Sequence, residues 1–277
     1  MAEITAALVR QLREETGLPM MDCKQALSEN GGDKEAAKEW LRKKGLKIQE
    51  GRGSRETAFG RFGIYAGLAN PTGGIVELKC ESAPVAGSAE FIQLANDMAK
   101  QLATGPGAKT GDELLDQPAP SQPGKTLRQV KDDMFNRIRE VFNVGRFARL
   151  DGTCGGYSHN SGTVSGVLVQ VEGGTDEAAK DVSMHVAAMR PLAVNTGEVD
   201  PATVEKERKI LREQALAEGK PANIVDKMVE GRLKNFFAEK VLLEQPFVKE
   251  NSLSVGKYAE SKGMKVKKFV HWELGKE

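Results

Sequence analysis

The clearest hydrophobic pattern in the chain is a short apolar run followed by an amphipathic one. Apolar residues fill most of positions 74–78 between glycine-containing segments, which is typical of a half-buried antiparallel strand. Gly63-Ile64-Tyr65 precedes this run, and after a loop come residues 90–103, where apolar side chains recur at helical spacing. The stretch therefore predicts a β-hairpin, a loop and a helix.

A second stretch shows the same order. Gly156-Tyr157 leads to an apolar run at 166–171, and a glycine-rich turn separates that run from a helical pattern at 176–189. In both stretches the tyrosine stands nine positions before the glycine that opens the run (74 minus 65, and 166 minus 157). One hairpin under one helix is marginally stable in water, so two such units predict a pseudo-duplicated α+β core of small antiparallel sheets with helices. Chance similarity between two ordinary hairpins is the alternative.

Residues 5–45 predict three short helices. The residues expected to begin or end them are Thr5 and Gly17 for the first, Pro19 for the second, and Asp33 and Gly45 for the third. Three such helices make a minimal bundle near the lower size limit for independent folding. We expect a domain at 1–46, followed at 47–60 by a polar linker rich in Arg and Lys.

An apolar loop, Leu18-Pro19-Met20-Met21, separates the first two predicted helices. Methionines on a module with so small an interior suit an adaptable binding surface. The alternative is that Met20 and Met21 complete the core of the bundle. The sequence leaves both interpretations open.

The middle of the chain is rich in helix breakers. Prolines and glycines are frequent at 104–125, which predicts an exposed loop and not a packed element. Residues 126–142 then show the pattern of a charged amphipathic helix that leads into the second stretch.

The last third of the chain predicts a helical hairpin and a final strand. Asp200-Pro201 is a typical cap and first-turn proline for a helix that reaches Glu218, and Pro221 begins another that reaches about Phe236. Their short connection predicts antiparallel helices, and their many charges predict that the hairpin projects from the core. Residues 266–274 are strand-like.

Composition and charge favour an ordinary soluble protein. Of the 277 residues, 40 are basic and 39 acidic, which disfavours a nucleic-acid binder that relies on a broad basic surface. Cys23, Cys80 and Cys154 are odd in number and widely spaced, which favours buried free thiols in a reducing compartment. Since no signal-peptide pattern opens the chain and no apolar run approaches bilayer length, we expect a cytoplasmic protein without a membrane partner.

The chemical groups do not form a recognisable catalytic set. His159, His185 and His271 have no carboxylate or cysteine at ligand spacing, so we expect neither a metal nor a cofactor. Nucleophile-elbow, Walker, dinucleotide and kinase motifs are missing from the sequence, which favours a protein that is not an enzyme. An enzyme that uses Cys154 and His159 is disfavoured because no orienting acid is evident beyond Asp151.

Several motifs, in order along nearly the whole chain, resemble the bacterial elongation factor Ts family. They are Ile4-Thr5-Ala6-Ala7-Leu8-Val9 with Thr16-Gly17, Met20-Met21-Asp22-Cys23-Lys24 and Ala26-Leu27; Tyr157-Ser158-His159 with Gly166-Val167-Leu168-Val169; Met184-His185-Val186-Ala187-Ala188 with Pro191; Lys227-Met228-Val229-Glu230-Gly231-Arg232; and Gln245-Pro246-Phe247-Val248.

The resemblance implies a fold and a function. The fold is a UBA-like (ubiquitin-associated-like) three-helix domain at 1–46, core halves at 61–145 and at 146–200 with 233–277, and a protruding antiparallel helical hairpin at 201–232. The function is that of a guanine-nucleotide exchange factor, which binds elongation factor Tu with GDP and promotes GDP release for GTP rebinding during translation elongation. Such a protein makes and breaks no covalent bond.

The chain departs from the family at the loop between the first repeated strand and its helix. There the family carries Thr-Asp-Phe-Val, whose acidic and aromatic pair is thought to wedge into the GTPase near its magnesium ion. The matching residues here, and hence the implied contact and magnesium-dislocation loop, are Ser82, Ala83, Pro84 and Val85. Ala83 carries no charge, and Pro84 is a smaller, rigid wedge. Other implied partner contacts are Leu12, Met20, Met21, Lys24, Ile138, His159 and Val248.

Two functional interpretations follow from this departure. In the first, exchange depends mainly on the N-terminal helices and on the second core half around His159. In the second, the protein is a chaperone-like binder of elongation factor Tu with weak exchange activity. An alternative from another class is a ribosome- or tRNA-associated structural protein that uses the hairpin and the basic residues at 265–268.

Overall fold

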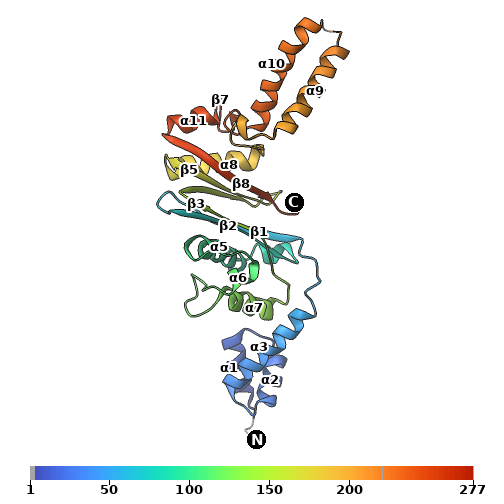
Figure 1. Cartoon of the computed structure of the whole chain (residues 1–277). Coiled ribbons are helices and arrows are strands. Elements are labelled where there is room, and N and C mark those ends of the chain that lie inside the picture. Colours follow the sequence, from blue (N-terminus) through green and yellow to red (C-terminus); the bar gives the residue numbers. More distant parts are fainter. Residues whose placement is uncertain (1–3, 220, 277) are drawn as a thin grey trace. The chain divides into compact units, whose positions relative to one another are not determined.

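The computed structural model describes residues 4–219 and 221–276, and Figure 1 shows their helices and strands in order. Contacts within the chain divide it into two compact units. Unit 1 consists of Met1–Gly63 and Val76–Phe147, and unit 2 consists of Ile64–Ile75 and Ala148–Glu277. The division passes through the three strands of one sheet, β1 (Phe59–Tyr65), β2 (Thr72–Cys80) and β3 (Asn143–Asp151).

Unit 1 begins with three helices, α1 (Ala6–Thr16), α2 (Met20–Glu29) and α3 (Lys34–Glu50). Helix α1 starts where the backbone N–H of Leu8 donates to the Thr5 hydroxyl, and it ends where Gly17 adopts φ 67°, a region that favours glycine. Helix α3 starts at Asp33, whose carboxylate accepts from a backbone N–H. The inward side chains form one apolar cluster, which includes Val9, Leu12, Cys23, Leu27 and Leu41.

The third helix is longer than the sequence predicted. Helix α3 passes through Gly45 and ends at Glu50, so the predicted stop at Gly45 is wrong. Gly45 faces helix α7 (Leu127–Ile138), where a Cβ atom on residue 45 would lie only 1.6 Å from the Asn136 Oδ1 atom. This glycine therefore permits a close helix–helix contact and does not terminate a helix.

The first sheet has the strand order β1-β2-β3. Strand β2 contains the predicted run at 74–78, whereas β3 was not predicted. The short helix α4 (Ala83–Ala86) and helix α5 (Ala89–Thr104) follow β2. Helix α5 buries Phe91 and Met98, and its backbone approaches β1 so closely that a Cβ atom on Gly63 would lie 1.9 Å from the Ala95 carbonyl oxygen.

The second sheet belongs to unit 2 and has the order β4-β5-β8. Its strands are β4 (Cys154–His159), β5 (Ser165–Gly173) and β8 (Met264–Glu273), and both pairings are antiparallel. Val167 of β5 lies opposite Tyr157 of β4 and His271 of β8. Helix α8 (Asp176–Met189) packs against this sheet, where Val182 and Val186 join the β5 valines in one buried cluster.

A close glycine contact recurs in both predicted repeats. Each repeat has two neighbouring strands before a helix, and a glycine of the first strand, Gly63 or Gly155, lies against an alanine of that helix, Ala95 or Ala179. The glycine stands two positions before the repeated tyrosine in both (65 minus 63, and 157 minus 155). A side chain at either glycine would collide with helix backbone, which gives a physical reason for the repeated pattern. Duplication of one ancestral unit stays a prediction.

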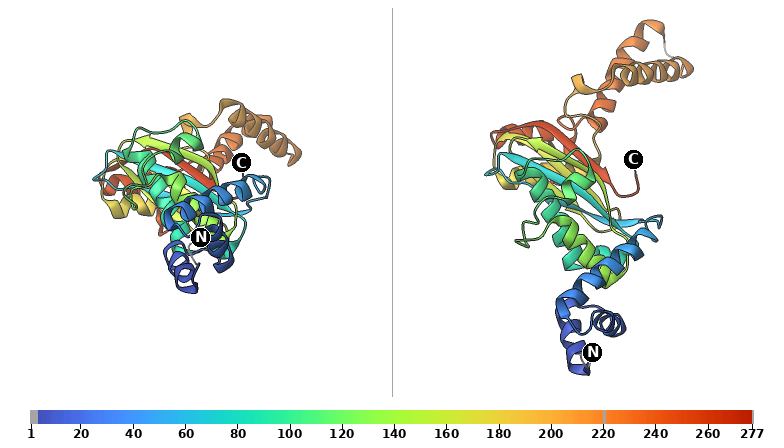
Figure 2. Two further views of the ribbon diagram at one scale, coloured as in Figure 1. Left: turned by 90° about the horizontal axis from the view of Figure 1, so that it is seen from below. Right: turned by 60° about the horizontal axis from the view of Figure 1, so that its bottom comes forward.

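Helices α9 (Pro201–Ala217) and α10 (Ala222–Lys240) lie side by side in unit 2, as both views of Figure 2 show. Asp200 caps α9, and Leu211, Ala215, Val225 and Val229 form a small buried cluster between the helices. Helix α10 continues past the predicted end near Phe236, so residues 237–240 also belong to it.

The segment at 104–125 is more ordered than the sequence predicted. It contains helix α6 (Gly111–Leu115), whose Leu114 and Leu115 are buried, so the prediction of an unpacked loop is wrong. The Ser121 backbone N–H donates to the buried carboxylate of Asp97 in α5. Two adjacent leucines are enough to pack a short helix here, and the surrounding prolines and glycines obscured that signal.

The remaining elements complete unit 2. They are the 3-10 helix η1 (Thr196–Glu198), β6 (Pro246–Phe247), β7 (Glu250–Ser254) and α11 (Val255–Ser261). Strands β6 and β7 pair antiparallel. In the described ranges, no helix has the length and apolar character that spanning a bilayer requires.

Candidate functional site

The segment at 82–85 forms a helical turn instead of the predicted loop. Ser82 is the N-cap of α4, and Pro84 occupies its first turn, where proline's fixed φ is suited to a helix. The Ala83 and Pro84 side chains are exposed, and Val85 is half-buried. The segment therefore presents a small, rigid apolar turn to the surroundings.

Two neighbouring side chains fix this turn at its ends. The Ser82 backbone N–H donates to Glu140 Oε2 at 3.1 Å, and the Ser82 hydroxyl donates to Glu140 Oε1 at 2.6 Å. At the other end, Arg61 Nε donates to the Ala86 carbonyl oxygen at 2.8 Å. Because one carboxylate accepts two hydrogen bonds from one residue, the beginning of α4 has little freedom to move.

The groups around α4 have limited chemistry. Burial raises the pKa of the Cys80 thiol to about 11, so that thiol stays neutral. Ala83 and Pro84 have neither a charge nor a side-chain donor. The turn can press against a partner through its shape, but it offers no carboxylate to a metal ion.

The predicted contacts on the N-terminal helices divide into exposed and buried residues. Met20 and Met21 are 42% and 71% exposed, so they do not complete the core of the three-helix group. Lys24, on the same helix, is also exposed. Leu12 is fully buried in the apolar cluster, so the structure does not support the predicted direct contact through it.

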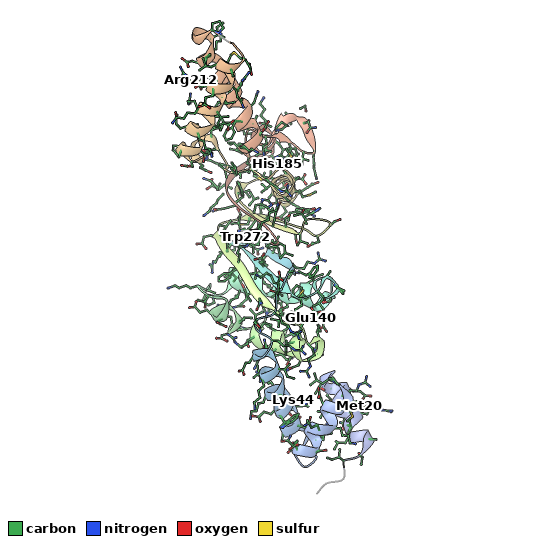
Figure 3. All side chains as sticks on the ribbon, turned by 90° about the vertical axis from the view of Figure 1, so that its right-hand side faces the viewer. Met20, Lys44, Glu140, His185, Arg212 and Trp272 are labelled. Atoms are coloured by element: carbon green, nitrogen blue, oxygen red, sulfur yellow. The ribbon has the colours of Figure 1, made fainter. Side chains whose placement is uncertain are left out.

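Ion pairs connect the inner side of α2 to α3 and to the end of α7. Asp22 accepts from Lys44 Nζ at 2.9 Å through Oδ1 and from Arg139 Nη2 at 3.0 Å through Oδ2. Ile138, another predicted contact, is the half-buried last residue of α7. Figure 3 labels Met20 and Lys44 on the N-terminal helices and Glu140 just after α7.

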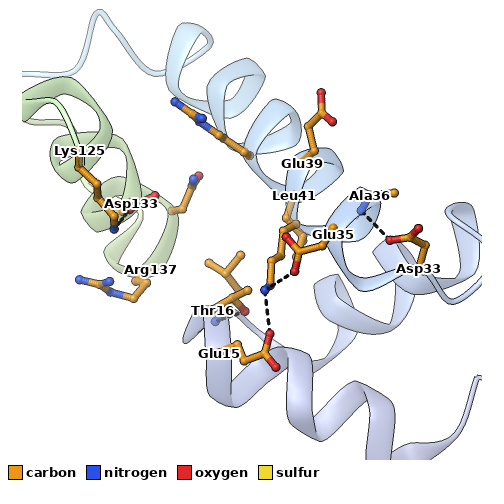
Figure 4. Close-up of a pocket in the computed structure, with 14 residues that line it drawn as sticks. Glu15, Thr16, Asp33, Glu35, Ala36, Glu39, Leu41, Lys125, Asp133 and Arg137 are labelled. Atoms are coloured by element: carbon orange, nitrogen blue, oxygen red, sulfur yellow. Dashed lines mark hydrogen bonds and ion pairs between the residues drawn. The ribbon is translucent and has the colours of Figure 1, made fainter. Parts of the chain in front are cut away.

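A hollow of about 720 Å³ in unit 1 is lined by charged residues, which Figure 4 shows in close-up. Glu15 accepts from Lys34 Nζ at 2.8 Å and lies 2.9 Å from Lys38 Nζ, and these hydrogen bonds lower the pKa of Glu15 to about 2. Lys125 and Asp133 form another ion pair at 2.7 Å. Since these charges neutralise one another, the hollow does not favour an ionic ligand.

The predicted contacts of unit 2 lie together at a second cavity, of about 430 Å³. Its lining includes His159 from β4, Arg190 after α8, and Val248 after β6. The Tyr157 hydroxyl lies 3.1 Å from the Nδ1 atom of His159. Val248 is 45% exposed.

A buried histidine places Val248 at this cavity. The Val248 backbone N–H donates to His185 Nδ1 at 3.2 Å, and His185 Nε2 lies 2.9 Å from the Gln245 side-chain oxygen. Nδ1 is thus an acceptor, which assigns the ring proton to Nε2. Burial lowers the pKa of His185, although the hydrogen bond with Gln245 opposes this shift, so the ring is neutral.

The described ranges contain no group of three or more His, Cys, Asp or Glu residues arranged to hold a metal ion. Cys23, Cys80 and Cys154 are buried free thiols, as the sequence predicted.

Glu140 and His185 are the residues whose roles sequence reasoning missed. Both position a predicted contact without being one, and each acts on a residue distant along the chain, Ser82 or Val248. His185 was correctly predicted to be packed, and its occurrence in a family motif was a usable signal. Glu140 follows the end of an amphipathic helix and carried no such signal.

Comparisons with known proteins find similarity along nearly the whole chain. The family model described as Elongation factor TS matches residues 84–276. The elongation factor Ts of Methylococcus capsulatus is 44% identical over 275 residues, which cover 98% of this chain and 92% of that protein. The elongation factor Ts of Aquifex aeolicus is 41% identical over 280 residues, which cover 96% of both chains. That of Thioalkalivibrio sulfidiphilus is 39% identical over 276 residues, which cover 98% of this chain and 92% of that protein.

Proposed function

The chain belongs to the elongation factor Ts family, and we propose that it is a guanine-nucleotide exchange factor that binds elongation factor Tu with GDP and promotes GDP release, so that GTP can rebind. The observation that carries this proposal is the 44% identity that extends over 98% of the chain. The protein acts by binding alone and catalyses no covalent step, and we expect it in the cytoplasm, where translation takes place.

Exchange of this kind is a coupling between two binding equilibria. A protein that binds the nucleotide-free GTPase more tightly than the GDP-bound form must weaken GDP binding by the same factor. Phosphate-cradling backbone and a magnesium ion hold GDP in such GTPases, so a partner that distorts either lowers its affinity. The contacts need to differ between the two forms by only about 1–3 kcal/mol to produce useful coupling.

Exposed surfaces on both units support this proposal. In unit 1 we assign the contact surface to Met20, Met21 and Lys24 on α2, to Ile138, and to the α4 turn, Ser82 to Val85. In unit 2 we assign it to His159 and Val248 at their shared cavity. Exposed apolar side chains on rigid supports are suited to a binding surface because little conformational entropy is lost when they are covered.

The α4 turn acts through shape in this chain. Ala83 has no charge with which to disturb a magnesium ion, so exchange depends mainly on the N-terminal helices and on the surface around His159. The turn still docks, because Glu140 and Arg61 hold it rigid. This distribution of contacts differs from one in which an acidic and aromatic pair disrupts the magnesium site.

The test is the release of labelled GDP from elongation factor Tu. The purified full chain is mixed at increasing concentration with the loaded GTPase and excess unlabelled GDP, and we expect the release rate to rise and then saturate. A release rate that does not change at saturating protein would contradict the proposed function. Binding without acceleration would instead indicate a chaperone-like partner.

A matched pair of variants tests the contact surface. Met20 and Met189 are almost equally exposed, at 42% and 43%, but only Met20 lies on the assigned surface. Met20→Glu should raise the half-saturating concentration about tenfold, because a charge would be buried in an apolar contact. Met189→Glu should leave it unchanged. Equal effects of the two substitutions would show that the surface is assigned wrongly.

A further inference from the structure

Three consecutive residues after helix α7 bind two separate parts of unit 1. Arg139 donates from Nη2 to Asp22 on α2, Glu140 accepts both hydrogen bonds from Ser82, and the Val141 N–H donates to Glu81 Oε1 at 2.8 Å. One short segment, 139–141, thus connects the helix that carries Met20 and Met21 with the start of the α4 turn.

Arg139, the first residue of this segment, has a backbone conformation that is sterically disfavoured for residues with a Cβ atom. Arg139 has φ 65°, in the left-handed region, where the Cβ atom of an L-residue comes close to the carbonyl oxygen. Arg139 and Arg190 are the two non-glycine residues with positive φ in the described ranges. Arg139 is the residue at which α7 ends, and glycine adopts this helix-ending conformation more easily than arginine does.

The side chain and carbonyl group of Arg139 are both used. Its guanidinium and the Asp22 carboxylate are each about one-quarter exposed, at 24%, so their ion pair is well protected from solvent. The Arg139 carbonyl oxygen accepts from Arg52 Nη1, at the end of α3. The left-handed turn therefore points Arg139 toward the N-terminal helices, while the next residue, Glu140, bonds to Ser82.

We propose that Arg139 and Glu140 form a clasp that fixes the methionine surface of α2 and the α4 turn in one register, so that binding at the first drives the second against the partner. Neither residue needs to touch the GTPase, so both are positioning residues. This inference rests on the proposed exchange function and identifies which residues couple its two contact elements in unit 1.

The clasp makes a specific kinetic prediction. When it is broken, α2 and α4 still bind, but binding at one no longer positions the other. The maximal rate of GDP release should therefore fall, while the half-saturating concentration, to which unit 2 also contributes, should change little. Loss of a residue that only stabilises the fold would lower the fraction of active protein, which raises the apparent half-saturating concentration and leaves the maximal rate at saturation unchanged.

The test uses the full chain with single and double substitutions. Glu140→Ala removes the acceptor for Ser82, and Asp22→Asn removes the carboxylate that binds Arg139. We expect each to lower the maximal rate about fivefold, which is within the range of ordinary coupling between sites. The double variant should be no slower than the slower single variant, because both substitutions break the same connection. Multiplicative effects, or single variants with the wild-type maximal rate, would overturn the proposal.

Two further variants distinguish loss of this hydrogen bond from misfolding. Glu140→Gln keeps an acceptor oxygen for the Ser82 N–H and an amide that can donate to its hydroxyl, so it should restore most of the rate. Ser82→Ala removes the 2.6 Å hydrogen bond from the opposite side and takes the place of Glu140→Ala if that variant does not fold. Failure of Glu140→Gln to exceed the Glu140→Ala rate would contradict the clasp.

A measurement without the partner separates this inference from the proposed function. Amide hydrogen exchange across 82–88 reports directly on the α4 turn in the free protein. We expect exchange there to be faster in Glu140→Ala than in wild type, and unchanged exchange would overturn the clasp. If the clasp is seen in this way but wild-type protein does not accelerate GDP release, the proposed function is wrong and the structural part of the inference stands.

Discussion

The α4 turn in unit 1 and the Val248 segment in unit 2 present apolar side chains by opposite means. Glu140, a half-buried carboxylate, holds α4 through two charge-assisted hydrogen bonds from Ser82. His185, a fully buried neutral ring, holds Val248 through its backbone N–H. Charge-assisted hydrogen bonds are strong even near solvent, and a buried neutral network is costly to disturb. Both segments are therefore held firmly, and we expect loss of the buried partner in unit 2 to cost more stability.

The two regions share one structural feature at a helix end. Each contains a helix that ends at an arginine in the left-handed conformation, Arg139 after α7 and Arg190 after α8. Each arginine binds a carboxylate, Asp22 or Glu273. Burial acts to raise the pKa of Glu273, but hydrogen bonds from Lys276 and Arg190 lower it overall, so it is ionised. A helix end fixed by an ion pair thus lies beside each predicted contact surface.

We expect the largest effect from a substitution that removes His185, the buried partner of the Val248 backbone N–H. His185→Ala leaves the Val248 N–H and the Gln245 side-chain oxygen without their partner and creates a cavity, so it should lower the free energy of unfolding by about 3 kcal/mol. Urea unfolding followed by circular dichroism measures this change. His159 is only half-buried, so His159→Ala should cost less than about 1 kcal/mol. Similar costs for the two variants would contradict the role of His185.

The next prediction compares glycines inside two helices. Gly45→Ala places a Cβ atom 1.6 Å from Asn136 Oδ1, so it should destabilise unit 1, by about 1–3 kcal/mol for an overpacked contact. Gly231 of α10 has open space around its Cα atom, so Gly231→Ala should stabilise the hairpin by about 0.5–1 kcal/mol. Thermal melting of both variants checks the signs, and a stabilising Gly45→Ala would contradict the close α3–α7 contact.

A smaller effect concerns pH. Burial lowers the pKa of His185 in the folded protein below 6.5, the usual value, which applies in the unfolded chain. At a pH between the folded and unfolded pKa values, the unfolded chain therefore binds more protons than the folded one. The contribution of neutral His185 to the free energy of unfolding is therefore fully present above about pH 6.5 and is lost as the pH falls toward the folded-state pKa. Urea unfolding at a series of pH values should show this decline. His185→Gln should reduce its slope, and the remainder reflects His271, whose pKa burial also lowers. An unchanged slope would exclude His185 as a source.

The smallest expected effect concerns α4 itself. Ala83→Asp combined with Pro84→Phe restores the acidic and aromatic pair of the family. If shape and the other contacts carry exchange, the maximal rate of GDP release should change by less than about threefold, which corresponds to about 0.7 kcal/mol. Stopped-flow measurement with labelled GDP decides the question. A large acceleration would show that this chain is a slow exchanger because it lacks the pair.

Much of the fold was predictable from local signals. The caps at Thr5, Asp33 and Asp200 place helix starts correctly, and the runs at 74–78 and 166–171 lie in strands. These predictions succeed because capping and strand alternation act within a few residues.

Several expectations that the structure does not match depend on distant partners. Gly45 reads as a helix stop, yet it serves contact with Asn136, which is remote in sequence. Leu12 is one of the partner contacts that the resemblance implies, yet it is buried in the apolar cluster of the three helices. The sequence did not decide between core and surface for Met20 and Met21, which are exposed. Glu140 and His185 bind Ser82 and Val248, which are distant along the chain. Tertiary packing decides such cases, and local sequence does not contain it.

We have proposed that this protein binds the nucleotide-free form of elongation factor Tu more tightly than the GDP-bound form. Titration calorimetry of the full chain with nucleotide-free and with GDP-bound elongation factor Tu tests this claim most directly. By linkage, the empty form should bind at least about tenfold more tightly, and the ratio should equal the factor by which the chain weakens GDP binding. Equal affinity for the two forms would contradict the account.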